Sequence, residues 1–115
     1  MEQEKDRRGM RFTFSAGAEI APGNSPNAFV PARVTELSLR GCFLETSATF
    51  EMLSPVLVKI YNSGENFEAE ASVLYIKPTG TGVLFREIEP RHRDVLQKWV
   101  LNALDKQPEA GLGPD

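Results

Sequence analysis

Apolar and polar residues alternate along several short stretches between residues 12 and 85, and this pattern constrains the fold more than any other feature of the chain. A period of two is typical of a β-strand with one buried face. The predicted strands cover residues 12–20, 29–37, 42–45, 56–60, 66–76 and 82–85. Turn formers separate most of them, at residues 22–27, 38–41, 62–64 and 78–80. In the stretch at 66–76 the predicted inward residues are Phe67, Ala69, Ala71, Val73 and Tyr75.

A helical pattern appears only near the end of the chain. Pro90 suits a first helical turn, and residues 91–106 contain no helix breaker. Apolar residues recur there at helical spacing on one face, namely Val95, Leu96, Trp99, Val100, Ala103 and Leu104. This stripe, led by Trp99, either plugs one end of a barrel or covers a partner subunit in a homodimer, and the sequence leaves both alternatives open.

Short antiparallel strands followed by a single helix predict an all-β fold, a small antiparallel β-barrel with one C-terminal α-helix. The length of 115 residues corresponds to one domain. Residues 1–6 are predicted to be a flexible polar N-terminal arm and residues 7–106 the folded domain. Residues 107–115 are rich in Pro and Gly and are predicted to be a disordered tail.

Charge and composition exclude several functional classes. The net charge of −3 argues against a general nucleic-acid binder, so no DNA or RNA partner is expected. The single cysteine, Cys42, cannot form an internal disulfide, and no cluster of Cys and His predicts a metal site. No apolar stretch is long enough to span a bilayer, and the start of the chain lacks the apolar core of a signal peptide. We therefore expect a cytoplasmic protein without membrane insertion.

Three arginines lie within five residues of this acidic chain, at Arg7, Arg8 and Arg11. Guanidinium groups pair bidentately with phosphate oxygens and stack on aromatic faces. Arg7 and Arg11 are four residues apart with Gly9 between them, a spacing that allows both to surround one phosphorylated ligand. The alternative is a solvated basic run that precedes the domain, and the arginines alone favour this plainer interpretation.

A carboxylate, a hydroxyl and a glycine follow at Glu36, Ser38 and Gly41, between two predicted strands. A carboxylate accepts two hydrogen bonds at once, as the N1–H and N2–H₂ edge of guanine requires. Gly41 permits a positive φ or a close approach of a ligand to the backbone. The alternative is a turn in which serine and glycine serve turn chemistry alone. Arg40 lies inside this stretch. The plainer interpretation is a surface side chain, and the alternative is a residue that adds positive potential beside the site.

Together the two motifs resemble the signature of the PilZ domain family, bacterial receptors for the second messenger cyclic di-GMP. That family carries an RxxxR arm and, further along, a (D/N)xSxxG stretch on the first strands of a six-stranded β-barrel. Arg7 and Arg11 match the first element, and Ser38 and Gly41 match the second. Glu36 stands where the family has Asp or Asn.

The resemblance extends over residues 5–106, because residues 80–85, a proline and a helix with a tryptophan are similar to the family's closing strand and C-terminal helix. It implies a six-stranded antiparallel barrel with one C-terminal helix, and cyclic di-GMP as the ligand with no cofactor. The arginines would clamp the phosphates and stack on guanine, the carboxylate and serine would hydrogen-bond a guanine edge, and the glycine would let the ligand approach. The implied ligand-binding residues are Arg7, Arg8, Arg11, Glu36, Ser38 and Gly41.

The implied function is that of a receptor that relays cyclic di-GMP binding, through a conformational change, to an unknown protein partner. The alternative is a PilZ-like protein-interaction adaptor with weak or no nucleotide binding, acting in motility or surface attachment. Glu36 favours this alternative, because its additional methylene moves the carboxylate by about 1.5 Å relative to Asp.

The sequence contains no recognisable catalytic constellation, so the protein is predicted not to be an enzyme. His92, the only histidine, has no acid or nucleophile at a suitable spacing and is predicted on the helix surface. Cys42 is predicted to be a small buried side chain. Glu65, Glu68 and Glu70 are predicted to form the solvated face of a hairpin.

Overall fold

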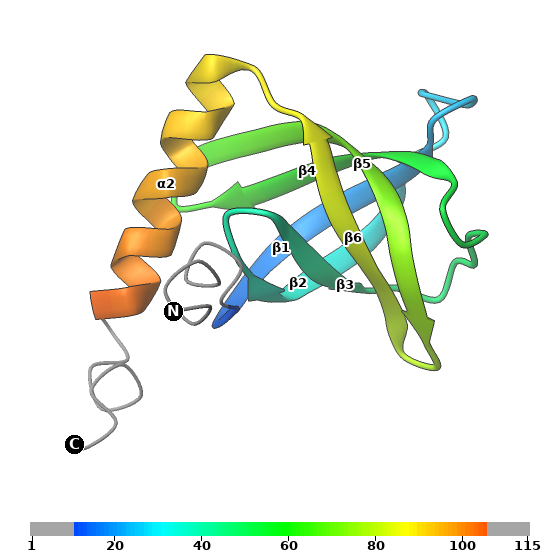
Figure 1. Ribbon diagram of the computed structural model, residues 1–115, viewed down its shortest axis with the longest axis horizontal. Helices are drawn as coiled ribbons and strands as arrows, with labels where there is room; N and C mark the ends of the chain where they lie inside the picture. Colours follow the sequence, from blue (N-terminus) through cyan, green and yellow to red (C-terminus); the bar gives the residue numbers. More distant parts are fainter. Residues whose placement is uncertain (1–10, 106–115) are drawn as a thin grey trace, which may run out of the picture.

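The computed structural model describes residues 11–105 and contains six strands and one helix (Figure 1). The elements are β1 (Phe12–Pro22), β2 (Val30–Leu37), β3 (Gly41–Glu45), β4 (Pro55–Asn62), β5 (Glu65–Lys77), β6 (Gly80–Glu87) and α2 (Pro90–Asp105). Each predicted strand is present, and its ends differ from the prediction by no more than a few residues. The predicted arm at residues 1–6 and tail at residues 107–115 lie outside the described residues.

The six strands form a closed antiparallel barrel in the order β1-β2-β3-β6-β5-β4. Closure occurs at β1, which pairs with β2 along one side and with β4 along the other. Pro31 lies near the start of β2, where a strand tolerates the loss of one backbone donor. The structure confirms the predicted fold class, an antiparallel six-stranded barrel followed by one C-terminal helix.

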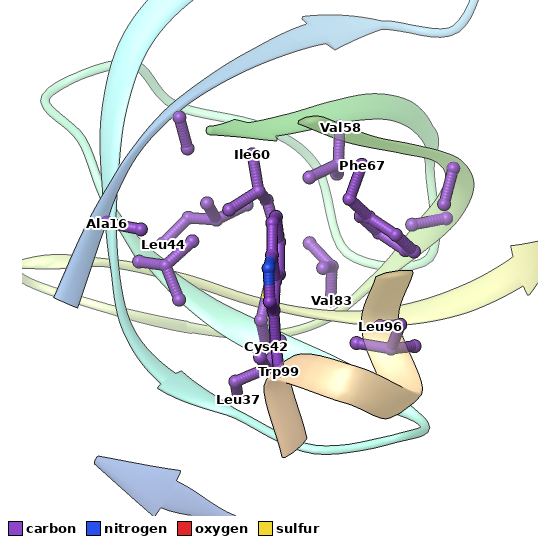
Figure 2. Packing of buried hydrophobic residues seen from close by; sticks show 14 of the residues in the cluster. Ala16, Leu37, Cys42, Leu44, Val58, Ile60, Phe67, Val83, Leu96 and Trp99 are labelled. Atoms are coloured by element: carbon purple, nitrogen blue, oxygen red, sulfur yellow. The ribbon is translucent and has the colours of Figure 1, made fainter. Parts of the chain in front are cut away.

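The interior of the barrel and the apolar face of α2 form one continuous core. From the helix, Leu96, Trp99, Val100 and Ala103 are buried in the same cluster as the inward residues of the strands. Trp99 is 2% exposed, and its ring stacks on Phe14 with centroids 5.5 Å apart. Figure 2 shows Trp99 reaching from the helix between strand side chains such as Ile60 and Leu37. The apolar stripe of the helix therefore covers the barrel of its own chain.

Polar contacts fix the helix at the rim of the barrel. The Glu65 carboxylate accepts hydrogen bonds from Lys98 Nζ at 2.8 Å and from Trp99 Nε1 at 3.2 Å. The bond from Lys98, ahead of the one from Trp99, lowers the pKa of Glu65 below its ordinary value. The expectation that Glu65 is simply solvated was wrong, because the start of β5 lies beside the helix.

His92 is also placed differently from the prediction. It is buried at 5% exposure instead of lying on the helix surface. Its Nδ1 atom accepts a hydrogen bond from the backbone N–H of Glu68 at 3.3 Å, and its ring meets Phe67 edge-on. His92 precedes Val95 by three residues and Trp99 by seven, so helical spacing places it on the apolar face of α2, where it contacts β5. Because this bond satisfies Nδ1, and no buried side-chain N or O atom of the described residues lacks a partner, we assign His92 a packing role.

Two register shifts determine which side chains reach the outer surface of the barrel. One lies in β2 between Val34 and Glu36, and the other lies in β5 between Val73 and Tyr75. Each inserts one residue and reverses the inward and outward phase of the strand beyond it. Val73 is fully buried, whereas Tyr75 is half-buried on the outer face. The prediction that Tyr75 points inward was wrong for this reason.

Candidate ligand-binding site on the outer face of the barrel

A row of four residues crosses four neighbouring strands on the outer face of the barrel. Glu36 of β2 pairs with Phe43 of β3, Phe43 pairs with Gly82 of β6, and Gly82 pairs with Tyr75 of β5. A Cβ atom at Gly82 would collide with the Tyr75 ring, so the ring lies directly over this glycine. The absence of a side chain at Gly82 therefore creates the space in which the tyrosine lies flat against the sheet.

Arg11 connects the two ends of this row. Its Nη1 atom donates a hydrogen bond to Glu36 Oε1 at 3.0 Å and a second one to the Tyr75 hydroxyl. Its guanidinium carbon is 5.1 Å from the centroid of the Tyr75 ring. Burial lowers the pKa of Arg11, but the hydrogen bonds to Glu36 and Tyr75 outweigh it and raise the pKa above its ordinary value. The site thus holds a fixed positive charge beside a carboxylate and an aromatic face.

Phe43, from the row, and Lys77 complete the cluster around Arg11. Phe43 stacks on Tyr75 with centroids 6.1 Å apart and an interplanar angle of 15°. It is buried at 7% exposure although it belongs to the outer row and not to the central core cluster. Lys77 Nζ lies 5.6 Å from the centroids of both rings. A stacked aromatic pair flanked by two cations can hold a planar ring and attract an anion.

The Ser38 side chain is part of a tight turn between β2 and β3. Its Oγ accepts hydrogen bonds from the backbone N–H groups of Arg40 at 3.0 Å and Gly41 at 3.1 Å. The backbone N–H of Ser38 donates to the Gly41 carbonyl at 2.9 Å, and the residue is 3% exposed. These contacts are those of the turn-forming alternative. The proposed contact of Ser38 with a ligand stays a prediction.

Gly41 has a structural requirement that the sequence did not disclose. Among residues 11–105, Gly64 is the glycine with a positive φ, so the positive φ considered for Gly41 was wrong. A Cβ atom at Gly41 would collide with the carbonyl oxygen of Val83. The glycine therefore allows β3 and β6 to approach each other, and this contact fixes the strand that carries Phe43.

The structure brings together two of the residues predicted for ligand binding, Arg11 and Glu36, and places Ser38 and Gly41 in the turn that follows Glu36. Arg7 and Arg8 lie outside the described residues. Sequence reasoning missed Tyr75, Phe43 and Lys77. Their spacing along the chain carries no motif, and only the cross-strand register unites them.

The described residues contain no group of side chains that could hold a metal ion. Within the same part of the chain, no helix is long and apolar enough to cross a membrane.

The fold and this outer site are those of a small barrel domain with a helix across its end, and comparison with known proteins identifies the class. The sequence matches the PilZ domain over residues 5–102. The chain therefore belongs to the PilZ domain family. A search of curated protein sequences finds no significant match.

Solved structures of PilZ domains share the fold at low sequence identity. The PilZ domain of CeSA from a cellulose-synthesizing bacterium aligns with a TM-score of 0.65 at 15% identity, over 81% of this chain and 96% of that chain. Escherichia coli YcgR in complex with c-di-GMP aligns with a TM-score of 0.69 at 15% identity, over 89% of this chain and 47% of that chain. Bacillus subtilis MotI/DgrA, an inhibitor of motility, aligns with a TM-score of 0.67 at 16% identity, over 84% of this chain and 50% of that chain. The matched region spans about half of each of the last two proteins.

Proposed function

We propose that this protein is a receptor for cyclic di-GMP, which it binds on the outer face of the barrel and signals to a protein partner. The observation that carries the proposal is the cluster in which Arg11 contacts both Glu36 and Tyr75. A cyclic dinucleotide presents anionic phosphates beside planar guanines. The cluster offers a guanidinium, a carboxylate and an aromatic face, the three groups that such a ligand requires.

The proposed roles follow from the chemistry of each group. Arg11, together with Arg7 and Arg8 of the RxxxR arm, binds phosphate oxygens and stacks on guanine. Glu36 accepts hydrogen bonds from guanine N1–H and N2–H₂, and the exposed edge of Tyr75 supplies a further aromatic contact. Ser38 and Gly41 hold the turn that positions Glu36. The proposed activity is binding alone, without chemistry on the ligand.

We also propose, from the contacts of Arg11, how ligand binding changes the surface that a partner detects. The Arg11–Glu36 pair is solvent-exposed, with side-chain exposures of 40% and 50%. Exposed ion pairs contribute about 0–1 kcal/mol, so a phosphate can draw Arg11 from Glu36 at little cost. This exchange frees the carboxylate for guanine and moves Arg11 relative to Tyr75. The partner would detect the rearranged surface. Because cyclic di-GMP is a bacterial second messenger, the proposed place of action is the bacterial cytoplasm.

Support for the proposal comes from two sides. The chain belongs to the PilZ family, and YcgR, with the same fold, has been solved in complex with c-di-GMP. The test is a calorimetric titration of the full chain with cyclic di-GMP, together with its melting temperature. We expect binding heat, a raised melting temperature and the loss of both in Arg11→Ala. Arg33→Ala is the matched control, since Arg33 is an exposed arginine of β2 that bonds Ser15 instead. Absence of heat and of any melting shift at high micromolar ligand would overturn the proposal.

A second candidate is a PilZ-like adaptor with weak or no nucleotide binding that acts through protein contacts in motility or surface attachment. The observation in its favour is that Glu36, longer than the Asp or Asn of the family, reaches Arg11 and satisfies it without a ligand. Under this alternative, Arg11→Ala leaves the cellular phenotype unchanged, whereas substitutions on the exposed face of α2 alter it.

A further inference from the structure

Three arginines in the described structure have no side-chain partner, and all three line the same pocket. Residues 11–105 contain nine lysines and arginines. Six of them contact a carboxylate, a serine hydroxyl or an aromatic ring, namely Arg11, Arg33, Lys59, Lys77, Arg91 and Lys98. The remaining three, Arg40, Arg86 and Arg93, are exposed and together line a pocket of about 350 Å³. We call it the arginine pocket.

The arginine pocket lies where the β2–β3 turn, the end of β6 and the first turns of α2 meet. Its walls are fixed, because the backbone N–H of Phe85 donates a hydrogen bond to the carbonyl of Arg40 at 2.8 Å. Four half-buried apolar residues share the lining with the arginines, namely Leu39, Leu84, Phe85 and Ile88. The pocket therefore combines positive charge with an apolar surface.

The carboxylates beside the segment between β6 and α2 line a different pocket from the three arginines, one that also contains Lys59 and Arg91. Glu87 and Glu89 line a different pocket, of about 670 Å³, whereas Arg86 and Arg93 line the arginine pocket. Ile88 borders both. No described carboxylate lines the arginine pocket or pairs with its guanidiniums. Three like charges gathered in this way repel one another, and an added anion relieves the repulsion.

We propose that the arginine pocket binds an acidic segment of a protein partner, in which carboxylates flank an apolar side chain. Guanidiniums bind carboxylates bidentately, and arginine is enriched in the parts of protein interfaces that contribute most to affinity. A free phosphate would satisfy the charges but leave the surface of Leu39, Leu84 and Ile88 unused. A peptide with acidic and apolar residues uses both parts of the pocket.

The arginine pocket is connected to the outer site through one turn. The backbone N–H of Arg40 donates to Ser38 Oγ, and Ser38 follows Glu36 by two residues. A ligand that displaces Glu36 therefore acts on the same turn that carries one wall of the pocket. This coupling rests on the proposed cyclic di-GMP function, whereas the pocket itself does not.

The test measures fluorescence anisotropy of a short fluorescein-labelled peptide of alternating Glu and Leu, titrated with the full chain in the absence of cyclic di-GMP. We expect saturable binding that Arg86→Glu and Arg93→Glu each weaken about tenfold or more. Arg91→Glu is the matched control. Arg91 is exposed on the same helix and lines the other pocket, so its reversal changes net charge equally and should leave the affinity within about twofold.

Every outcome of this experiment bears on the proposal. Absence of peptide binding, or equal losses in Arg91→Glu and Arg93→Glu, overturns it. Competition by inorganic pyrophosphate at lower concentration than by unlabelled peptide overturns the protein partner in favour of a phosphorylated ligand. A peptide of Glu alone that binds as tightly overturns the role of the apolar lining. Cyclic di-GMP titration of Arg93→Glu, in the same preparation, separates failure of the pocket from failure of the proposed receptor function.

Discussion

Arg11 Nη1 lies 3.0 Å from Glu36 Oε1, so two residues that we propose for ligand binding neutralise each other in the free protein. The pair joins the start of β1 to the end of β2 across the outer face of the barrel. A ligand must therefore compete with an internal ion pair before it can use either group. The length of the acidic side chain sets how strong that competition is.

Glu36→Asp tests this competition directly. Shortening the side chain moves the carboxylate about 1.5 Å away from Arg11, so the guanidinium is released for phosphate. We expect equal or tighter cyclic di-GMP binding by calorimetry, with a change in unfolding free energy below about 1 kcal/mol. Glu36→Gln keeps the length and removes the charge, and it should bind more weakly than the parent. Tighter binding by the glutamine variant than by the aspartate variant would contradict this explanation.

Tyr75 is predicted to support both the site and the sheet. Tyr75→Phe removes the hydroxyl that Arg11 contacts and keeps the stack on Phe43. We expect it to retain stability and lose part of the ligand affinity. Tyr75→Ala also uncovers Phe43 and should lower the unfolding free energy by about 1–3 kcal/mol, measured in urea. Equal stability of the two variants would show that the stack contributes nothing.

Gly41 and Gly17 form a matched pair for testing strand packing. A Cβ atom at Gly41 collides with the Val83 carbonyl, whereas nothing lies within 4 Å of one at Gly17. Gly41→Ala should destabilise the protein by about 2 kcal/mol or more, since backbone must move to relieve the clash. Gly17→Ala should be neutral or stabilising by up to about 1 kcal/mol. Urea unfolding of both variants measures the difference, and similar midpoints would refute the packing requirement.

Glu65 is predicted to make helix docking dependent on pH. Its pKa is lowered in the folded protein, first by the bond from Lys98, so its contribution is present above the ordinary value of 4.5 and is lost as pH falls through the lowered value. Glu65→Gln should reduce the melting temperature near neutral pH. The difference in melting temperature between this variant and the parent should disappear in acid. Fluorescence of Trp99 reports the transition. A difference that stays constant into strong acid would exclude the ionised carboxylate as its cause.

The thiol of Cys42 is predicted to be inert in the folded protein. Burial raises its pKa to about 12, with a smaller opposing effect from the charge of Arg11. Only the thiolate reacts readily with disulfide reagents. We expect no reaction with such a reagent near neutral pH and full reaction of one thiol in denaturant. Fast labelling of the native protein would mean that the barrel opens near β3.

The strands and the helix were predictable because alternation and helical spacing are local properties. The apolar stripe around Trp99 packs on the barrel, one of the two positions that the sequence left open. Tyr75 was not predictable in the same way, since the extra residue in β5 reverses the phase of the pattern. Glu65 was misplaced because its partners, Lys98 and Trp99, come from the helix, far along the chain. His92 shares the helical spacing of Trp99, and its burial was missed because its polar partner belongs to β5.

The candidate site was predictable only in part. Arg11 and Glu36 were found from their motifs, and the structure places them in contact. Phe43 and Lys77 have no sequence motif, because they become neighbours only through the pairing of β3, β6 and β5. The packing role of Gly41 depends on its contact with Val83 of β6, a strand far away along the chain, so the sequence did not reveal it.

Closure of the barrel limits how this protein can associate. Each of its six strands hydrogen-bonds to a neighbour on both sides, with β1 and β4 completing the circle. No described strand is therefore unpaired along the whole of one side, and the stretches without a partner strand are short, such as residues 12–16 of β1 on the side of β4. Addition of a full-length strand would first require part of the barrel to open. A partner must therefore recognise mainly side chains, and the same geometry limits edge-to-edge aggregation.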